Sequence, residues 1–267
     1  MSEKKRKETA VIFSQEEIAA GIYSLWIKTS FAKEARPGQF LGVYLNNPAK
    51  LLARPISICD VKPEEDLLRM VYRVAGKGTD ELSTYNEGTE IKVLGVLGNG
   101  YEKALGSGDL NEALKGKKVI VIGGGIGIPP MLLTAKSIDS DVEIVLGYSN
   151  GDLFLEDEFE DAGNLHIATV DGSVGTKGTV IDAMKEDEVK GDIIFACGPM
   201  PMLKALKEYA KENGMKAYIS LEERMACGVG ACLGCVCKTV KKDHHTNVNN
   251  TRICVEGPIF DAEEVDI

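Results

Sequence analysis

The sequence reads Cys227-Gly-Val-Gly-Ala-Cys232-Leu-Gly-Cys235-Val-Cys237 near its C-terminal end, so that four of its seven cysteines fall within eleven residues. One more cysteine, Cys254, follows after a polar loop. Cysteines gathered this closely are typical of a metal or cluster site, because thiolates are strong ligands and a short loop directs several of them to one place. The stretch therefore predicts a small metal-binding unit late in the chain.

The spacing of these cysteines indicates the kind of unit. Cys-x4-Cys-x2-Cys with one distant Cys is the ligand spacing of plant-type [2Fe-2S] proteins. Two irons bridged by sulfides need two thiolates each, and a tight loop supplies three of the four. Glycines in the loop let the backbone wrap closely and turn N–H groups toward the sulfurs. The predicted ligands are Cys227, Cys232, Cys235 and Cys254.

The cysteines also suit other kinds of site, which stay open. Four thiolates make a structural zinc site too, although zinc ribbons usually pair two Cys-x2-Cys units and this chain has one. A disulfide knot is a further alternative, but no secretory signal accompanies it. The paired His244 and His245 suggest a His-ligated Rieske centre, yet four cysteines suffice, so we expect a solvated loop there. Cys237 is a fifth nearby thiol, and we expect it to be a buried spectator.

Charge and hydropathy exclude several partners. The formal net charge of -10 and a pI near 5.0 argue against nucleic acid. Residues 1–8 are Lys-rich and lack the apolar core of a signal peptide. The longest apolar run, residues 119–133, is interrupted by glycines and by Pro129-Pro130, so it predicts no membrane span. We expect a cytoplasmic protein with reduced thiols and neither nucleic acid nor membrane as partner.

The first third of the chain is typical of short strands separated by turns. Turn signals such as Arg36-Pro37-Gly38 and Gly76-Lys77-Gly78 bound runs rich in Val, Ile, Leu and Tyr. Six strands at this spacing predict a small antiparallel barrel. The expected strands are residues 9–13, 22–29, 40–45, 56–60, 67–74 and 90–94.

Two motifs on the predicted barrel suit a phosphate. Arg54-Pro55-Ile56-Ser57 offers a planar guanidinium for a pyrophosphate and a short hydroxyl. Val71-Tyr72-Arg73 precedes Gly76-Lys77-Gly78-Thr79, whose glycines allow backbone N–H groups to approach a phosphate. Thr79 is expected to cap a helix that begins near Asp80. Each motif alone also fits a plain structural role, namely a surface arginine at a strand start or a hairpin turn.

The middle of the chain has the pattern of a parallel α/β sheet. A polar linker at residues 106–117 precedes a buried strand, the turn Gly123-Gly124-Gly125-Ile126-Gly127 and a helix. Backbone donors in such a turn bind phosphate, and Pro129 or Pro130 pre-sets the helix start. The turn departs from Gly-x-Gly-x-x-Gly because no third helix-packing glycine follows. Strands are expected at 118–122, 142–148, 165–169, 192–196 and 216–221, and helices at 131–137, 155–162, 180–186 and 201–213.

A third motif, Cys197-Gly198-Pro199, stands at the carboxyl end of an expected strand, where open α/β sheets bind ligands. The alternative is a buried cysteine before a turn. A 2′-phosphate favours a nearby arginine, and Gly147-Tyr148-Ser149-Asn150 offers none, so we expect NADH rather than NADPH. Asp152 and Glu156 are the candidates to accept a hydrogen bond from a ribose.

Together the barrel motifs resemble the ferredoxin–NADP reductase superfamily, which carries Arg-x-Tyr/Ile-Ser on one barrel strand and a glycine-rich phosphate turn after the next. Arg36-Pro37-Gly38-Gln39-Phe40 and Val96-Leu97-Gly98-Asn99-Gly100-Tyr101 also match its landmarks. The resemblance implies FAD on the barrel, a nucleotide on the glycine-rich turn and Cys197 beside the nicotinamide. The implied cofactor-binding residues are Arg54, Pro55, Ile56, Ser57, Val71, Tyr72, Arg73, Gly78, Thr79, Gly124, Gly125, Gly127, Cys197, Gly198 and Pro199.

One branch of that superfamily matches more of the chain. Glu222-Glu223-Arg224-Met225-Ala226-Cys227 and the cluster spacing resemble the electron-transfer subunits of NAD-dependent (type 1B) dihydroorotate dehydrogenases over nearly the full length. Asp171-Gly172-Ser173-Val174-Gly175 and Lys177-Gly178 agree. The resemblance implies an α+β multidomain chain. Its parts are an antiparallel FAD-binding β-barrel (1–103), a parallel α/β NAD-binding domain (104–218) and a small C-terminal [2Fe-2S] domain (219–267).

The same resemblance implies an electron path and a partner. Dihydroorotate reduces FMN in a separate catalytic subunit, and electrons cross the [2Fe-2S] cluster and FAD to NAD+, a diffusible substrate, in pyrimidine (UMP) biosynthesis. The implied assembly is a heterotetramer of two of each subunit. No substrate base or FMN barrel is evident in this sequence, so the pyrimidine chemistry is expected on the partner. Arg224 and the loop near Cys232 are expected to form part of the docking surface.

Two alternatives to this function remain. Within the superfamily, the chain would be a flavin and iron–sulfur subunit of a hydrogenase or of an NADH:ferredoxin oxidoreductase. From another class, it would be a zinc-stabilised binding module without flavin. About fifty residues bury little core, so we expect the cluster to hold the C-terminal unit folded.

Overall fold

The computed structural model describes residues 5–242 and 247–267 of the chain. The predicted solvated loop at His244 and His245 lies outside this part. So do the first four residues of the Lys-rich start. Among the described residues, no helix is long and apolar enough to cross a membrane.

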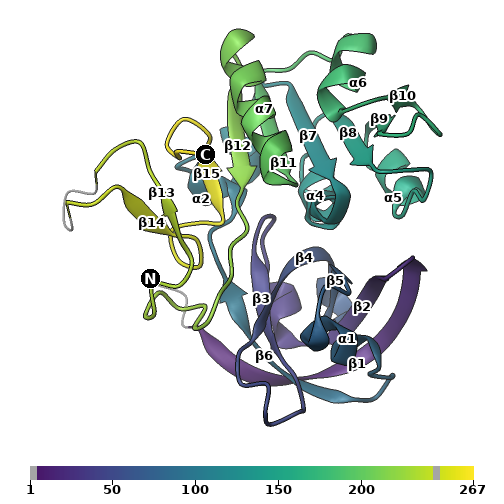
Figure 1. Cartoon of the computed structure of the whole chain (residues 1–267), viewed down its shortest axis with the longest axis vertical. Helices are drawn as coiled ribbons and strands as arrows, with labels where there is room; N and C mark the ends of the chain where they lie inside the picture. Colours follow the sequence, from purple (N-terminus) through teal and green to yellow (C-terminus); the bar gives the residue numbers. More distant parts are fainter. Residues whose placement is uncertain (1–4, 243–246) are drawn as a thin grey trace.

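Six strands close into an antiparallel barrel in the order β1-β2-β5-β4-β3-β6, which confirms the predicted barrel (Figure 1). The first strand is much longer than expected. Bulges after Ile12 and after Glu17 keep it paired while it bends around the barrel. Alternate side chains fill the interior, where Leu25, Ile58 and Met70 are completely buried. The strands are β1 Arg6–Ala19, β2 Ile22–Lys28, β3 Phe40–Tyr44, β4 Arg54–Lys62, β5 Leu67–Arg73 and β6 Glu90–Leu97.

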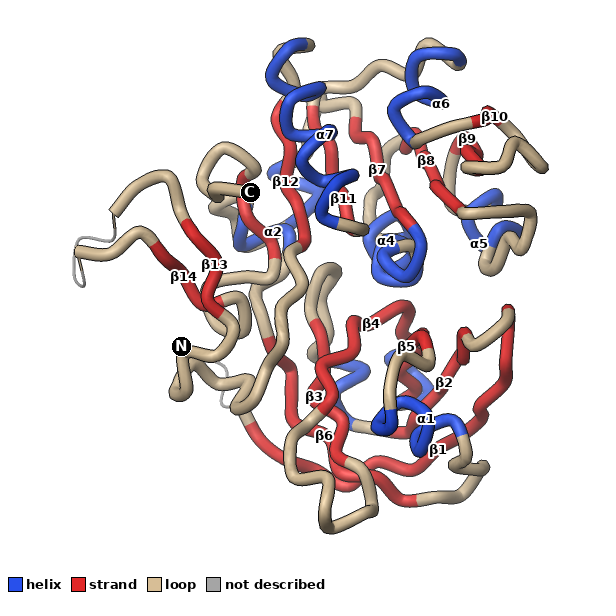
Figure 2. The backbone as a smooth tube through the Cα atoms, in the orientation of Figure 1, coloured by secondary structure: helices blue, strands red, loops and turns tan. Residues whose placement is uncertain are grey.

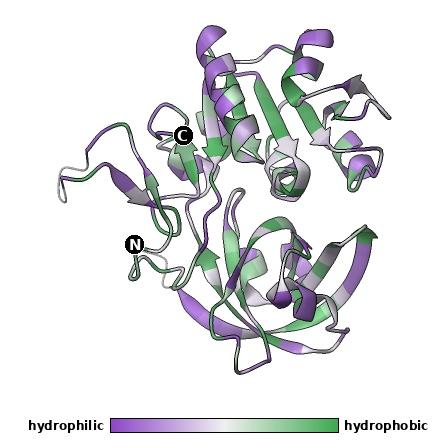
Figure 3. Cartoon of the chain, viewed as in Figure 1, coloured by the Kyte–Doolittle hydropathy of each residue, from purple (hydrophilic) through white to green (hydrophobic). Residues whose placement is uncertain are grey.

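The second half of the chain forms a seven-stranded sheet in the order β10-β9-β8-β7-β11-β12-β15. The five expected strands are present and pair in parallel. The apolar runs of the adjacent strands β7 and β11 are buried on both faces, and Figure 3 colours the middle of the sheet as hydrophobic. The last strand, β15, is an addition that pairs antiparallel with β12. The strands are β7 Val119–Gly124, β8 Val142–Tyr148, β9 Asn164–Thr169, β10 Thr176–Lys177, β11 Ile193–Cys197, β12 Lys216–Ser220 and β15 Ile259–Asp261.

Helices cover both faces of this sheet, and each face has its own core. Helices α6 and α7 pack with residues such as Ile120 and Ile194, whereas α4 and α5 pack with Val121 and Phe195. The second core continues into the barrel through Val71, so the barrel and the sheet share one apolar interface. The helices that cover the sheet are α4 Pro129–Lys136, α5 Glu156–Glu160, α6 Val180–Glu186 and α7 Met200–Glu212.

Short helices occupy the connections. The segment expected as a plain polar linker contains α3, whose Asp109 side chain accepts a hydrogen bond from the N–H of Glu112 and so caps it. The short elements are η1 Ser30–Lys33, η2 Pro63–Glu65, α1 Lys77–Ser83, α2 Tyr101–Ala104, α3 Leu110–Ala113 and η3 Gly125–Gly127.

The C-terminal segment lies beside both larger units (Figure 2). After β12 the chain runs through the cysteine loop into a hairpin of β13 Val236–Lys238 and β14 Asn250–Arg252, and then returns to the sheet as β15. Cys235 and Cys254 are buried in the core that also contains Phe40 and Leu97 of the barrel. This segment therefore completes its core with residues of the two larger units.

Candidate functional site

Arg54 and Gly78 lie against each other at one end of the barrel. A Cβ added to Gly78 would lie 2.3 Å from Nε of Arg54, so any larger residue would push the guanidinium out of this position. Arg54 also donates to the carbonyl oxygen of Leu52. The structure thus joins the first residue of one predicted phosphate motif to the glycine of the other, although they are far apart in the sequence.

The role expected for Thr79 differs in detail. Helix α1 begins at Lys77, earlier than predicted, and its N-terminal cap is Gly76. Thr79 is the third helical residue, and its hydroxyl accepts hydrogen bonds from the N–H groups of Ala75 at 2.9 Å and Gly76 at 3.3 Å. Thr79 therefore closes the turn before the helix rather than starting the helix itself, because the glycine already supplies the extended cap geometry.

The residues of the motif on β5 point in different directions. Tyr72 is buried in the barrel, where its hydroxyl donates to Oε1 of Gln15 at 2.8 Å and its ring stacks on Tyr23. Val71 is buried in the interface with the sheet. Arg73 is exposed, and its guanidinium reaches the glycine-rich turn, 3.7 Å from where a Cβ on Gly125 would lie. Of the three residues of this motif, only Arg73 reaches the glycine-rich turn of the α/β sheet.

The glycine-rich turn is held tightly against the end of β11. A Cβ added to Gly127 would lie 2.4 Å from the carbonyl oxygen of Cys197, and one added to Gly124 would lie 2.5 Å from Sδ of Met202. Backbone atoms cannot give way as a flexible side chain can, so Gly127 is required by packing. The structure therefore brings Gly124, Gly127 and Cys197 together at the carboxyl edge of the sheet.

Cys197 is a protonated thiol at neutral pH. Burial raises its pKa to about 12, while a hydrogen bond with Ser220 on the neighbouring strand acts in the opposite direction. A neutral thiol does not act as a base.

The loop after β8 carries the candidates for the ribose. Asn150 and Asp152 hydrogen-bond to each other, with the N–H of Asp152 donating to Oδ1 of Asn150 at 3.2 Å. Asp152 is exposed, and Glu156 begins helix α5. The loop therefore leaves the Asp152 carboxylate accessible, and its role toward a ribose stays a prediction.

The four predicted cluster ligands fall into two neighbouring pairs. Cys227 and Cys232 are neighbours, with the N–H of Cys232 donating to Sγ of Cys227 at 3.4 Å, and the thiol of Cys254 lies beside that of Cys235. The second pair forms because the β13–β14 hairpin sets Ile253 beside Cys235, with the N–H of Ile253 donating to the Cys235 carbonyl at 2.9 Å. Two thiols for each of two irons is the ligand division of a [2Fe-2S] cluster.

Backbone donors surround the first pair. Sγ of Cys227 accepts from the N–H groups of Val229, Ala231 and Cys232 at 3.3–3.4 Å, and Sγ of Cys232 accepts from Gly234 at 3.4 Å. Burial acts to raise the pKa of Cys227, but these donors outweigh it and lower the pKa to about 6. The loop thus stabilises thiolate sulfur, which is the form that ligates iron.

The second pair lies deeper. Cys235 is 3% and Cys254 is 1% exposed. Burial, and to a smaller degree the neighbouring thiol of Cys235, raises the pKa of Cys254 to about 12. Cys237 is half-buried on β13, and burial raises its pKa to about 11. Within the described residues, no three His, Cys, Asp or Glu side chains converge on a single ion position. The donor set fits a two-iron cluster, with thiols in pairs and N–H groups aimed at sulfur.

The cysteine loop also contacts the barrel. Gly228 adopts a φ of 68°, and a Cβ added there would lie 3.2 Å from Cδ1 of Leu97 on β6. Gly230 has a φ of 81°, and its carbonyl accepts from Nη1 of Arg252 at 3.1 Å. Both positions favour glycine. The close fit at Gly228 sets the first ligand pair directly against the barrel wall.

Comparisons with known proteins agree with this geometry. The profile of the iron-sulfur cluster binding domain of dihydroorotate dehydrogenase B matches residues 222–266. The "dihydroorotate dehydrogenase B (NAD(+)), electron transfer subunit" of Fusobacterium nucleatum subsp. nucleatum is 40% identical, over 97% of this chain and 98% of its own length. This chain belongs to that family. The relative of the same name in Shouchella clausii is 41% identical over 98% of this chain and 99% of its own length.

A solved structure extends the likeness to three dimensions. The structure titled "Insights into flavin-based electron bifurcation via the NADH-dependent reduced ferredoxin-NADP oxidoreductase structure" has a TM-score of 0.83 at 33% identity and covers 100% of this chain and 91% of the other. Members of the dihydroorotate dehydrogenase B electron-transfer family are NAD-linked oxidoreductase components. The predicted family, fold class and cofactors, namely a [2Fe-2S] cluster, FAD and NAD, are confirmed by these comparisons.

Sequence patterns did not identify every residue around these sites. Lys50 and Glu81, which brace the loop before Arg54, were not predicted, and neither was the part that Asn99 plays at the C-terminal segment. Asn99 lies inside the barrel landmark Val96–Tyr101, and this landmark could have pointed to it. No sequence motif marks Lys50 and Glu81, because their pairing depends on the closure of the barrel.

Proposed function

We propose that this chain carries electrons from dihydroorotate oxidation, in a separate FMN-containing catalytic subunit, through a [2Fe-2S] cluster and FAD to NAD+ in pyrimidine (UMP) biosynthesis. The observation that carries the proposal is the pairing of four cysteines, three of which lie in a loop that packs on the barrel wall at Leu97. This contact brings a one-electron centre to the flavin domain.

The predicted site residues have separate roles in this electron transfer. When bound, FAD exchanges electron pairs with NAD and single electrons with the cluster. Arg54, Gly78 and Thr79 hold its pyrophosphate, and Pro55, Ile56, Ser57, Val71, Tyr72 and Arg73 form the adjoining barrel wall. Gly124, Gly125 and Gly127 admit the NAD phosphates, and Cys197-Gly198-Pro199 lines the nicotinamide position. Cys227, Cys232, Cys235 and Cys254 ligate the irons, and Cys237 does not.

The partner docks on the exposed side of the cysteine loop. Val229 is 44% and Leu233 is 61% exposed there, beside the exposed thiol of Cys232 and near the exposed Arg224. Apolar side chains around a redox centre suit a subunit interface, because they exclude water from the electron path. The assembly is a cytoplasmic heterotetramer of two subunits of each kind, and the chain divides at residues 103 and 218 into its three domains.

The test is orotate-linked NADH formation. The purified chain is mixed with the FMN-containing dihydroorotate-oxidising subunit, dihydroorotate and NAD+, and NADH absorbance is followed. We expect turnover only when both subunits are present, and a visible spectrum of the chain with flavin and iron–sulfur bands. A colourless preparation containing zinc would overturn the proposal in favour of a zinc-stabilised module.

A docking variant refines this test. Arg224→Glu is expected to weaken co-purification with the catalytic subunit, whereas Lys204→Glu, on the exposed face of α7, is expected to leave it intact. Equal retention of the partner by both variants would remove Arg224 from the docking surface.

A second function is favoured by one observation. The structural relative titled as an NADH-dependent reduced ferredoxin-NADP oxidoreductase aligns over the full chain. The alternative is therefore an electron-transfer subunit that serves a ferredoxin-linked partner. The test mixes reduced ferredoxin with NAD+ and the chain. We expect NADH to form no faster than in the same mixture without the chain. Fast NADH formation without the dihydroorotate-oxidising subunit would favour the alternative.

A further inference from the structure

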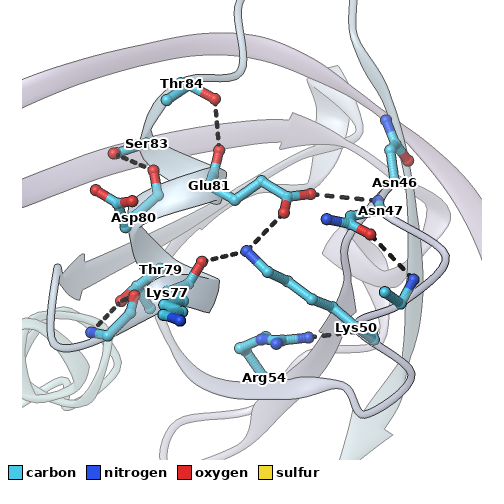
Figure 4. Close-up of polar contacts among 12 residues, drawn as sticks. Asn46, Asn47, Lys50, Arg54, Lys77, Thr79, Asp80, Glu81, Ser83 and Thr84 are labelled. Atoms are coloured by element: carbon cyan, nitrogen blue, oxygen red, sulfur yellow. Dashed lines mark hydrogen bonds and ion pairs between the residues drawn. The ribbon is translucent and has the colours of Figure 1, made fainter.

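The loop between β3 and β4 is fastened to helix α1 at two places (Figure 4). Nζ of Lys50 pairs with Oε2 of Glu81 at 2.7 Å and donates to the carbonyl oxygen of Lys77. The other carboxylate oxygen of Glu81 accepts from the N–H of Asn47 at 3.2 Å and from the hydroxyl of Tyr85 at 2.6 Å. Glu81 therefore binds both the beginning and the middle of the loop.

The hydroxyl of Tyr85 completes the arrangement. It donates to Glu81 and accepts from the N–H of Asn46 at 2.8 Å, so the loop is also held where it leaves β3. Hydrogen bonds from Lys50 and Tyr85 lower the pKa of Glu81 to about 2, so the carboxylate is charged at any physiological pH. The side chains of Lys50 and Glu81 are 23% and 18% exposed, which protects the pair from full solvent screening.

The fastened loop leads directly into Arg54. Nη1 of Arg54 donates to the carbonyl oxygens of Leu52 and, at 3.4 Å, of Lys50, so the guanidinium takes its direction from the loop backbone. Its other face lies on Gly78 in helix α1. Lys50 and Glu81 thus tie together the two segments between which the guanidinium lies.

We propose that Lys50 and Glu81 are positioning residues for FAD: their ion pair holds the β3–β4 loop on helix α1 and thereby orients Arg54 toward the flavin pyrophosphate. The inference rests on the proposed role of Arg54. Both residues lie outside the two predicted phosphate motifs, and neither needs to touch FAD. A preorganised guanidinium binds phosphate more tightly than a mobile one, because less side-chain freedom is lost on binding.

The test measures the affinity of the full chain for FAD. The flavin is first removed from the purified protein and is then added back in known amounts. Lys50→Gln and Glu81→Gln are titrated with FAD, and quenching of flavin fluorescence gives the Kd. Each variant is expected to raise the Kd about tenfold, the loss typical of a charge-assisted hydrogen bond. Because the pair acts as a unit, the double variant should lose little more than either single one. Lys50→Arg, which keeps the charge and a donor, should restore most of the affinity.

Controls separate positioning from general loss of structure. Lys33→Gln breaks an ion pair of the same length, 2.7 Å, with Asp66 at a more exposed place on the barrel, and should leave the Kd unchanged. The iron–sulfur absorbance and the unfolding temperature of the flavin-free variants should match the parent. A Kd within twofold of the parent for Lys50→Gln and Glu81→Gln, while Arg54→Ala weakens FAD, would overturn the inference alone. An unchanged Kd for Arg54→Ala would instead remove the proposed pyrophosphate site, and the inference with it.

Discussion

Asn99 and Ile259 are joined by two hydrogen bonds that run in opposite directions. Nδ2 of Asn99 donates to the Ile259 carbonyl at 2.8 Å, and the N–H of Ile259 donates to Oδ1 of Asn99 at 3.0 Å. The N–H of Asn99 also donates to the carbonyl of Gly257 at 2.6 Å. One buried side chain thus fixes the exit of the barrel to the strand that follows the last predicted iron ligand.

Asn99→Ala should weaken this junction strongly. The change leaves a buried N–H and a buried C=O of Ile259 unpaired, so we expect the free energy of unfolding to fall by about 3 kcal/mol. Urea unfolding followed by flavin fluorescence and cluster absorbance measures it. Asn111→Ala is the matched control, because Asn111 makes a similar pair of bonds to Ser137 and Asp139 inside the nucleotide-binding unit. If Asn111→Ala lowered the free energy of unfolding more than Asn99→Ala does, the junction at Asn99 would not be a major contributor to stability.

The proposed ligand set predicts opposite outcomes for two nearby cysteines. Cys232→Ser should lose most of the iron and sulfide, because one of four thiolates is replaced by a weaker ligand. Cys237→Ser should keep the full content of both. Iron and sulfide analysis, together with the visible spectrum, measures the difference. Loss of the cluster from Cys237→Ser, or its retention in Cys232→Ser, would show that the ligands are misassigned.

Gly127→Ala should impair the use of NADH. The added Cβ would collide with the Cys197 carbonyl at 2.4 Å, so the turn must move at a cost of about 1–3 kcal/mol. A displacement beside the proposed nicotinamide position should slow flavin reduction at low NADH by about tenfold or more. Stopped-flow bleaching of the flavin measures the rate. Gly108→Ala, where a Cβ meets nothing within 4 Å, should keep the parent rate, and equal slowing in both would contradict the role of the turn.

The pKa of Cys197 predicts a change of stability in alkali. Burial raises the pKa from about 9, its ordinary value, to about 12, so the folded chain keeps a proton that the unfolded chain releases. The resulting stabilisation is fully present below pH 9 and is lost as the pH rises toward 12. In Cys197→Ala this loss is absent, so the stability gap between parent and variant should shrink by about 1 kcal/mol for each pH unit above 9. A gap that stays constant from pH 8 to pH 10.5 would contradict a Cys197 thiol that stays protonated in the folded chain.

Local signals predicted the strands and helices well where the pattern repeats. The runs at residues 142–148 and 180–186 coincide with β8 and α6, because hydrophobic periodicity is a local property of the sequence. The start of α1 was misplaced, because Gly76 competes with Thr79 as the cap. The edge strand β15 was not expected, since its three residues carry no periodic signal of their own.

By itself the sequence determined which chemical groups are present: five thiols gathered near the C-terminal end at cluster-like spacing, a guanidinium and a glycine turn for phosphates, and alternating strands and helices. Each of these depends on residues close together in the chain. Only the tertiary structure decided that Cys254 meets Cys235, that Gly228 rests on Leu97, and that Lys50 reaches Glu81. Those contacts arise from the closure of the barrel and from the register of a hairpin, and both depend on segments distant in sequence.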